Sequence, residues 1–213
     1  MMPYYEQDGI IIYHGDCREI LPTLCPDVVL TDPPYNVGKD YGASQDDLSD
    51  AEYEELLICV AMATERQAWV TPTTRLPFYW RLLGDAARLV IIRKGAQGVY
   101  RYGWFDQLFP LLVRGDPYTK GPNLWEGIRL PGEGYFFREE TFGHPGYTAT
   151  PIMVRLVECM TKPVDLIVEP FAGTGTTLVA AKQCGRRAVG IEMNEPYCEI
   201  AAKRLSQGVL ELV

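Results

Sequence analysis

The chain has 213 residues, of which 47% are hydrophobic and 23% charged, and its formal net charge is −8. These values are typical of one globular domain, here residues 1–213, and the absence of a signal-like N-terminus or a run of about 18 apolar residues argues against secretion and membrane insertion. The six cysteines form no C-x-x-C pair and the only histidines are His14 and His144. We therefore expect reduced thiols in a cytoplasmic protein, and no metal site.

Two runs of aliphatic residues near the start of the chain, residues 9–14 and 27–31, predict strands. Neither run alternates with polar residues, which is typical of parallel strands that helices cover on both faces. Residues 17–21 between them predict a short helix, which Asp16 is placed to cap.

Directly after the second strand, residues 31–35 read Thr-Asp-Pro-Pro-Tyr. Proline fixes φ, lacks an N–H and restricts the residue before it, so Asp32 and the carbonyl of Pro33 have few alternative orientations. Both groups accept hydrogen bonds, and Tyr35 adds an aromatic face. This combination suits an amino group on a flat ring, and a plain Pro-Pro turn that closes a strand is the alternative interpretation.

A polar loop over residues 36–47 leads to Ser49-Asp50-Ala51-Glu52, a capping box that predicts the start of a helix. Beyond it, the pattern predicts strands at 68–70 and 88–93 and a helix at 78–84, and the Gly- and Pro-rich stretch 94–146 contains strand candidates at 108–114 and 124–130.

Positive charge is concentrated in this middle part of the chain. Residues 66–138 contain 11 Lys and Arg against 5 Asp and Glu, a net charge of +6, whereas the rest has 9 against 23, a net charge of −14. Phosphate contacts need local positive charge, so a DNA-facing surface is one interpretation and a solvated mixed surface is the other. The basic candidates are Arg93, Lys94, Arg101, Arg114, Lys120, Arg129 and Arg138, interleaved with Tyr100, Tyr102, Trp104, Tyr118, Trp125 and Tyr135.

Strands and helices alternate again toward the C-terminus. Helices are predicted at 150–160, 176–184 and 195–205, and strands at 165–168 and 187–191. The alternation predicts an α/β fold with a doubly wound, mostly parallel sheet.

A second motif, residues 169–177 (Glu-Pro-Phe-Ala-Gly-Thr-Gly-Thr-Thr), lies between a strand and a helix. Its glycines allow a ligand to approach the backbone, and the helix N-terminus offers N–H groups to an anion. Glu192 ends the next strand, where an acidic residue can bind ribose hydroxyls. The motif has no Gly-Lys-Ser/Thr, and Leu178 stands where a dinucleotide fingerprint needs Gly or Ala. A cofactor with ribose but no pyrophosphate fits best, and S-adenosylmethionine is one.

With both motifs placed, the chain resembles the amino-directed DNA methyltransferases, which methylate adenine N6 or cytosine N4. The catalytic motif precedes the glycine loop, as in the circularly permuted β-group of that family. The resemblance covers residues 9–42 and 144–205 and implies a Rossmann-like methyltransferase fold, S-adenosylmethionine as cofactor, and double-stranded DNA as substrate in a prokaryotic or phage-infected cell. His144-Pro145 resembles a family element, but the Lys-Pro that normally follows is missing.

The resemblance also implies the site residues. Those implied to be catalytic are Asp32, Pro33, Pro34 and Tyr35, and those implied to bind the cofactor are Asp16, Cys17, Glu169, Phe171, Ala172, Gly173, Thr174, Gly175, Thr176, Glu192 and Met193. Helix capping by Asp16 and core packing by Met193 are the alternative interpretations of those two residues. Glu169 stands where the family usually has Asp.

The implied reaction is methyl transfer to the exocyclic amine of a flipped base, with Tyr35 stacked on the ring. Adenine N6 is favoured over cytosine N4 because Asp at the first motif position is more usual for adenine. Cytosine C5 methylation is disfavoured because no cysteine follows a proline. Two other functions stay open: methylation of RNA or a protein amide, and a catalytically silent DNA-binding subunit. The resemblance also implies that residues 94–146 are a small target-recognition insert, and the short length of this region implies a short target, a partner or a homodimer.

Overall fold

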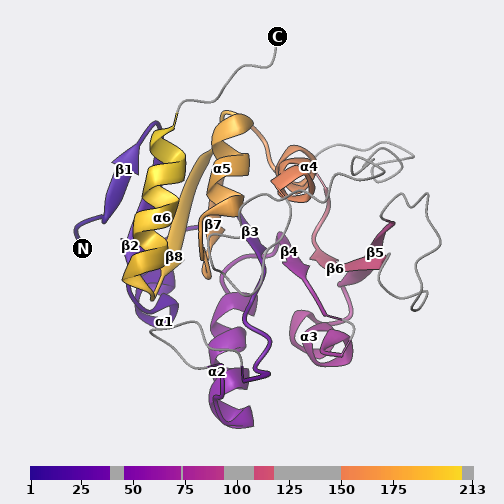
Figure 1. Ribbon diagram of the computed structural model, residues 1–213. Coiled ribbons are helices and arrows are strands. Elements are labelled where there is room, and N and C mark those ends of the chain that lie inside the picture. Colours follow the sequence, from indigo (N-terminus) through magenta and orange to yellow (C-terminus); the bar gives the residue numbers. More distant parts are fainter. Residues whose placement is uncertain (39–45, 73, 94–107, 118–149, 208–213) are drawn as a thin grey trace, which may run out of the picture.

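The computed structural model describes residues 1–38, 46–72, 74–93, 108–117 and 150–207. The strands are β1 (Tyr5–Gln7), β2 (Ile10–His14), β3 (Val28–Thr31), β4 (Gln67–Val70), β5 (Arg88–Arg93), β6 (Leu108–Arg114), β7 (Leu166–Glu169) and β8 (Arg187–Glu192). The helices are α1 (Cys17–Ile20), α2 (Asp50–Ala61), α3 (Leu76–Leu83), α4 (Thr150–Met160), α5 (Thr176–Gln183) and α6 (Glu195–Ser206), with a 3₁₀ turn η1 (Leu21–Thr23). Figure 1 shows their arrangement.

All the described strands form one sheet, in the order β1-β2-β8-β7-β3-β4-β6-β5. The five strands from β2 to β4 in this order are parallel to one another, whereas β1 pairs antiparallel with β2, and β6 pairs antiparallel with both β4 and β5. The predicted α/β fold with a mostly parallel sheet is confirmed.

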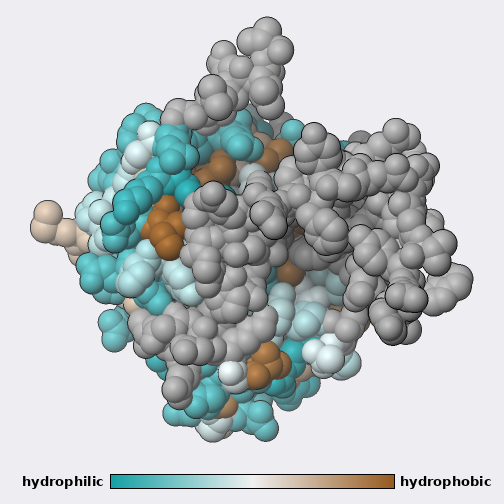
Figure 2. Space-filling model, viewed as in Figure 1, coloured by the Kyte–Doolittle hydropathy of each residue, from teal (hydrophilic) through white to brown (hydrophobic). Residues whose placement is uncertain are grey.

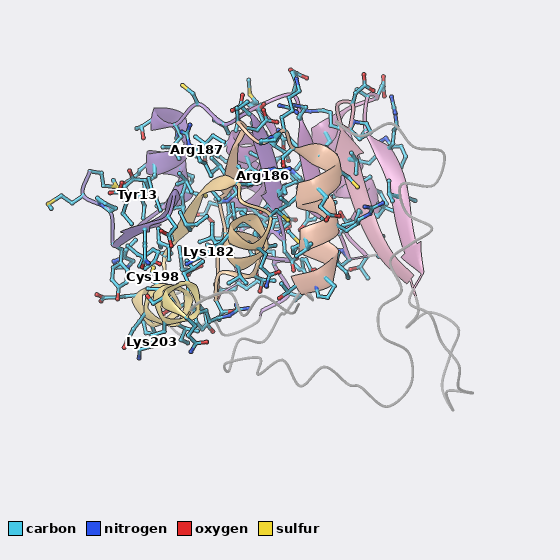
Figure 3. The ribbon with its side chains drawn as sticks, turned by 90° about the horizontal axis from the view of Figure 1, so that it is seen from above. Tyr13, Lys182, Arg186, Arg187, Cys198 and Lys203 are labelled. Atoms are coloured by element: carbon cyan, nitrogen blue, oxygen red, sulfur yellow. The ribbon has the colours of Figure 1, made fainter. Side chains whose placement is uncertain are left out.

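Helices cover both faces of the sheet. Val28 and Leu30 of β3 lie in the same buried cluster as side chains of α4, α5 and α6. Val29 points the other way, into a cluster with side chains of α1, α2 and α3. Figure 3, seen from above, shows Lys182 of α5 and Cys198 of α6 on the same side of the sheet. Strands that are buried on both faces explain the unbroken aliphatic runs of the sequence.

The order of the strands reverses between β3 and β7. From β3 the chain continues through α2 to β4 on one side, and from β7 it continues through α5 to β8 on the other. Ligands of doubly wound folds bind at the carboxyl ends of the strands at such a switch point. The two sequence motifs directly follow these two strands.

The predicted elements agree with the structure to within a few residues. The capping box at α2 is present, because the Ser49 hydroxyl accepts from the Glu52 backbone and the Glu52 carboxylate accepts from the Ser49 backbone. Strand β1 was not predicted, since its Tyr-Glu-Gln sequence has no hydrophobic pattern. The candidate strand 124–130, His144-Pro145 and the insert at 94–146, apart from residues 108–117, lie outside the described residues.

The visible surface over α5 and α6 is mostly hydrophilic, with hydrophobic residues in small separate patches (Figure 2). In the ranges that the structure describes, no helix is both long and apolar enough to span a bilayer. The same ranges contain no group of three or more His, Cys, Asp or Glu side chains that could hold a metal ion.

Candidate active site

The two motifs meet through a direct hydrogen bond between the ends of β3 and β7. The Thr31 hydroxyl donates to Oε1 of Glu169 at 2.5 Å, and both residues are buried, with 0% and 2% exposure. Thr31 immediately precedes Asp32, and Glu169 opens the glycine-loop motif. The predicted convergence of the two loops at neighbouring strand ends is confirmed.

The Glu169 carboxyl group also holds its own loop and helix. Oε1 accepts from the Phe171 backbone N–H at 3.1 Å, and Oε2 accepts from the Thr177 hydroxyl at 2.7 Å. Burial raises the pKa of Glu169 to about 8, and the charge of Asp32 adds to this, while the three hydrogen bonds act in the opposite direction. The buried Glu169 carboxyl group therefore keeps its proton to a higher pH than an exposed glutamate does.

The glycine loop turns sharply between β7 and α5. Gly173 and Gly175 have φ of 50° and 83°, a region that side chains disfavour. A Cβ on Gly175 would also lie 2.8 Å from Cβ of Ala201, so this glycine lets α5 and α6 pack closely. Backbone hydrogen bonds from Gly175 to Ala172 (2.8 Å) and from Ala172 to Ile191 (2.9 Å) close the turn. The result is a helix N-terminus that faces the switch point.

Glu192 ties the end of β8 to this loop. Its Oε2 accepts from the Gly173 N–H and its Oε1 from the Asn194 N–H, both at 2.7 Å. Burial raises the pKa of Glu192, and these backbone donors oppose the rise. The neighbouring Met193 is 43% exposed, so it is not a core methionine.

Asp16 and Cys17 lie at the end of β2, next to β8. Asp16 caps α1, since it accepts from the Arg18 N–H at 2.8 Å, and hydrogen bonds from the Arg18 guanidinium lower its pKa. The predicted helix cap is confirmed. Burial raises the pKa of the Cys17 thiol to about 12, which keeps it protonated at neutral pH. Gly15 donates to the Glu192 carbonyl at 2.9 Å and so joins this turn to the glycine-loop side of the site.

The Asp-Pro-Pro-Tyr segment leaves β3 as an irregular loop. The Tyr35 hydroxyl donates to Oδ1 of Asp32 at 2.8 Å, which links the carboxylate to the aromatic ring. The Pro34 carbonyl accepts from the Tyr53 hydroxyl at 2.6 Å, and the Tyr79 hydroxyl lies 3.2 Å from the same oxygen. Neither tyrosine stands out in the sequence, because nothing in their helical patterns indicates contact with residue 34.

This arrangement matches that of known DNA methylases. A family model described as DNA methylase matches residues 103–203. The type II methyltransferase M2.LlaDCHI of Lactococcus lactis subsp. cremoris is 43% identical over 256 residues, which cover 97% of this chain and 93% of that protein. The chain belongs to the amino-directed DNA methyltransferases.

Other relatives extend the comparison. This methyltransferase is 24% identical to the DNA adenine methyltransferase YhdJ of Escherichia coli strain K12 over 244 residues, which cover 91% of this chain and 82% of YhdJ. The crystal structure of an M1.HpyAVI-SAM complex superposes with a TM-score of 0.67 and 24% identity, covering 92% of this chain and 99% of that one. This likeness supports the methyltransferase fold.

The structure changes the interpretation of Arg114, a candidate for DNA contact in the methyltransferase. Its guanidinium donates to the backbone carbonyls of Ala61 and Thr64 inside the protein, and its side chain is only 13% exposed. The guanidinium of Arg114 is thus used inside the protein, because the end of α2 needs donors for its last carbonyls. The other candidate side chains of this segment, those of Arg93, Lys94, Arg101, Lys120, Arg129, Arg138 and the six aromatic residues, lie outside the described residues.

Proposed function

We propose that this methyltransferase transfers a methyl group to adenine N6 of a nucleotide flipped out of double-stranded DNA. S-adenosylmethionine is the methyl donor, and it supplies an electrophilic methyl group on a sulfonium. The observation that carries the proposal is the Thr31–Glu169 hydrogen bond, which joins the two motif loops at the switch point of the sheet. Cofactor binding and orientation of the target base are assigned to side chains and backbone groups of this chain.

The cofactor residues fit the chemistry of their ligand. Both Glu192 oxygens accept from backbone N–H groups, and a carboxylate oxygen can accept more than one hydrogen bond, which suits two vicinal ribose hydroxyls. The N-terminus of α5 suits the carboxylate of the methionine moiety. We assign to Asp16 the adenine amine and to Met193 the adenine face, while Cys17, Glu169 and the loop residues Phe171, Ala172, Gly173, Thr174, Gly175 and Thr176 shape the cradle.

Asp32 and the Pro33 carbonyl each accept one hydrogen bond from the target amine. These bonds turn the nitrogen lone pair out of ring conjugation, and Tyr35 stacks on the flipped ring. When bound, S-adenosylmethionine would supply a methyl group whose bond to sulfur breaks as the bond to the amine nitrogen forms, and the amine would release a proton to solvent. Orientation and preorganised acceptors supply the catalysis, so no covalent enzyme adduct is required.

Adenine is supported by the Asp at the first motif position and by the similarity to YhdJ, whose name states that it is an adenine methyltransferase. Cytosine N4 is the alternative within the same family. We assign target recognition to residues 94–146, whose short length favours a short target, a partner or a homodimer. The reaction would take place in the cytoplasm of a bacterial or phage-infected cell.

The test is methylation of heterologous genomic DNA by the purified protein and S-adenosylmethionine, followed by mass spectrometry of the nucleosides and single-molecule sequencing. We expect N6-methyladenine at one short recurrent sequence. N4-methylcytosine would overturn the choice of base, and methylation confined to RNA or protein would overturn the choice of substrate. Cofactor binding without transfer to any DNA would indicate a silent subunit.

A further inference from the structure

The catalytic loop has an unusual shortage of its own hydrogen-bond donors. Pro33 and Pro34 carry no N–H, so the segment after Asp32 cannot be fixed by a ladder of backbone bonds. Its carbonyls still need donors, because they lie partly buried beside α2 and α3. The structure supplies these donors from side chains far away in the sequence.

Two buried tyrosines lie against the Pro34 carbonyl. Tyr53 of α2 and Tyr79 of α3 are 1% and 0% exposed, and their hydroxyls lie 2.7 Å from each other. Both lie within hydrogen-bond distance of the Pro34 carbonyl, Tyr53 closer than Tyr79. The Tyr53 ring stacks on Phe78, and the Tyr79 ring packs edge-on against Trp69, each with centroids 5.6 Å apart. The hydroxyl pair is therefore fixed by the core.

Arg75 holds the next two carbonyls. Its Nε donates to the Tyr35 carbonyl at 3.0 Å, and its Nη2 donates to the Asn36 carbonyl at 2.7 Å. The guanidinium carbon lies 5.5 Å from the centre of the Tyr53 ring, a cation–π contact that joins the arginine to the tyrosine pair. Three consecutive carbonyls, those of residues 34–36, are thus held by one side chain of α2 and by Arg75 and Tyr79 at the N-cap and in the middle of α3.

The far end of the loop is fixed in a complementary way. The Asp46 carboxylate, 6% exposed, accepts from the N–H groups of Asn36 and Val37 at 2.7 and 2.9 Å. Asn36 has φ of 52°, so the chain turns sharply there. The backbone from residue 34 to residue 37 is therefore held on both its donor and its acceptor sides.

We propose that Arg75, Tyr53 and Tyr79 are positioning residues that orient Asp32 and the Pro33 carbonyl toward the target amine through the backbone of residues 34–36. The inference rests on the proposed function, since it assigns the orientation of the same acceptors. None of the three side chains needs to touch base or cofactor. Their effect falls on the methyl-transfer step and not on cofactor affinity, because the cofactor residues lie at the ends of β2, β7 and β8.

The decisive experiment compares Arg75→Met with Arg81→Met on the same helix. Arg81 is exposed and pairs with Glu54 of α2 at 3.0 Å, so its loss also removes an α2–α3 contact but leaves the catalytic loop intact. We expect Arg75→Met to lower kcat about 10- to 100-fold, since a displacement of about 1 Å can cost that much, with the cofactor Kd within about twofold of wild type. Arg81→Met should keep wild-type kcat.

Two further variants separate orientation from general stability. Arg75→Lys can restore one of the two carbonyl contacts, so its kcat should lie between those of wild type and Arg75→Met. The Tyr53→Phe/Tyr79→Phe double variant should lower kcat more than either single variant, because either hydroxyl alone can still reach the Pro34 carbonyl. All rates are measured well below the unfolding midpoint of each variant, with the folded state verified by circular dichroism.

A readout independent of turnover keeps this inference distinct from the proposed function. Hydrogen exchange at the amides of residues 35–38 should be faster in Arg75→Met and unchanged in Arg81→Met. Methylation of cytosine would overturn the proposed base, and the absence of methylation on any DNA would overturn the proposed activity. In either case the exchange rates would still report on the loop. Unchanged exchange, or a kcat for Arg75→Met within twofold of wild type, overturns the positioning of the loop.

Discussion

The glycine loop and the Asp-Pro-Pro-Tyr loop end adjacent strands of one sheet, yet they are held in place by different kinds of contact. In the glycine loop, backbone N–H groups of Phe171, Ala172, Gly173 and Gly175 all donate within the motif or to the neighbouring strand β8 and its end. Arg204 of α6 adds a remote contact, to the Thr174 carbonyl at 2.5 Å.

The Asp-Pro-Pro-Tyr loop depends almost wholly on remote side chains. Its carbonyls accept from Tyr53, Tyr79 and Arg75, which lie 19 to 45 positions away in the sequence. The comparison teaches that a motif rich in glycine carries most of its own geometry, whereas a motif rich in proline restricts its conformers but needs the tertiary structure to select one.

The largest effect is expected at the centre of the proline-rich loop. Asp32→Ala removes the carboxylate to which we assign the orientation of the amine, so methyl transfer should fall by about two to three orders of magnitude, the scale seen when such a stabilising group is lost. The cofactor Kd, measured by calorimetry, should stay within a few-fold because Asp32 lies on the other loop. Full activity in this variant would refute the assigned role.

The matching change in the glycine loop should act on the cofactor. Gly173→Val places a β-branched side chain at φ of 50° and disturbs the N–H that donates to Glu192, so we expect cofactor binding to be lost. Gly185→Ala is the control, since Gly185 also has positive φ but has open space where a Cβ would lie. Both variants should be less stable, and wild-type cofactor affinity in Gly173→Val would contradict the prediction.

The Glu169 carboxyl group, which links the two loops, should titrate. Because the pKa of Glu169 is raised to about 8 by burial, the folded state holds a proton that the unfolded state releases near pH 4.5, so stability falls as the pH rises from about 5 to 8. Glu169→Gln cannot titrate and should remove about 1 to 3 kcal/mol of this pH dependence. Urea unfolding of both proteins at pH 5.5 and 8.0 is the measurement, and parallel pH dependence would show that Glu169 is ionised when folded.

The smallest expected effect concerns the internal bond of the proline-rich loop. Tyr35→Phe removes the hydroxyl that donates to Asp32 but keeps the aromatic face, so kcat should fall only about 3- to 10-fold, as for the loss of one hydrogen bond of about 1 kcal/mol. Tyr35→Ala also removes the stacking surface and should lose more. Steady-state kinetics on the same DNA decide this, and equal losses in the two variants would assign the whole effect to the hydroxyl.

Most of the architecture follows from local patterns in the sequence. Unbroken aliphatic runs such as Val28–Leu30 indicate strands covered on both faces, and Ser49 with Glu52 marks the start of α2, because burial and capping act over a few residues. The two motifs and their order were likewise sufficient to predict the fold, the family and the meeting of the loops at adjacent strand ends.

Other properties depended on which distant side chains the fold brings together. Arg114 belongs to a basic segment, yet the structure uses its charge to hold the end of α2. The sequence predicts that Glu169 binds the cofactor, but its buried carboxyl group accepts hydrogen bonds from the hydroxyls of Thr31 and Thr177. Tyr53 reads as an apolar position on a helix, although its hydroxyl supports the catalytic loop. A linear pattern encodes burial and backbone preference, whereas the partner of a polar group is decided only when remote elements pack.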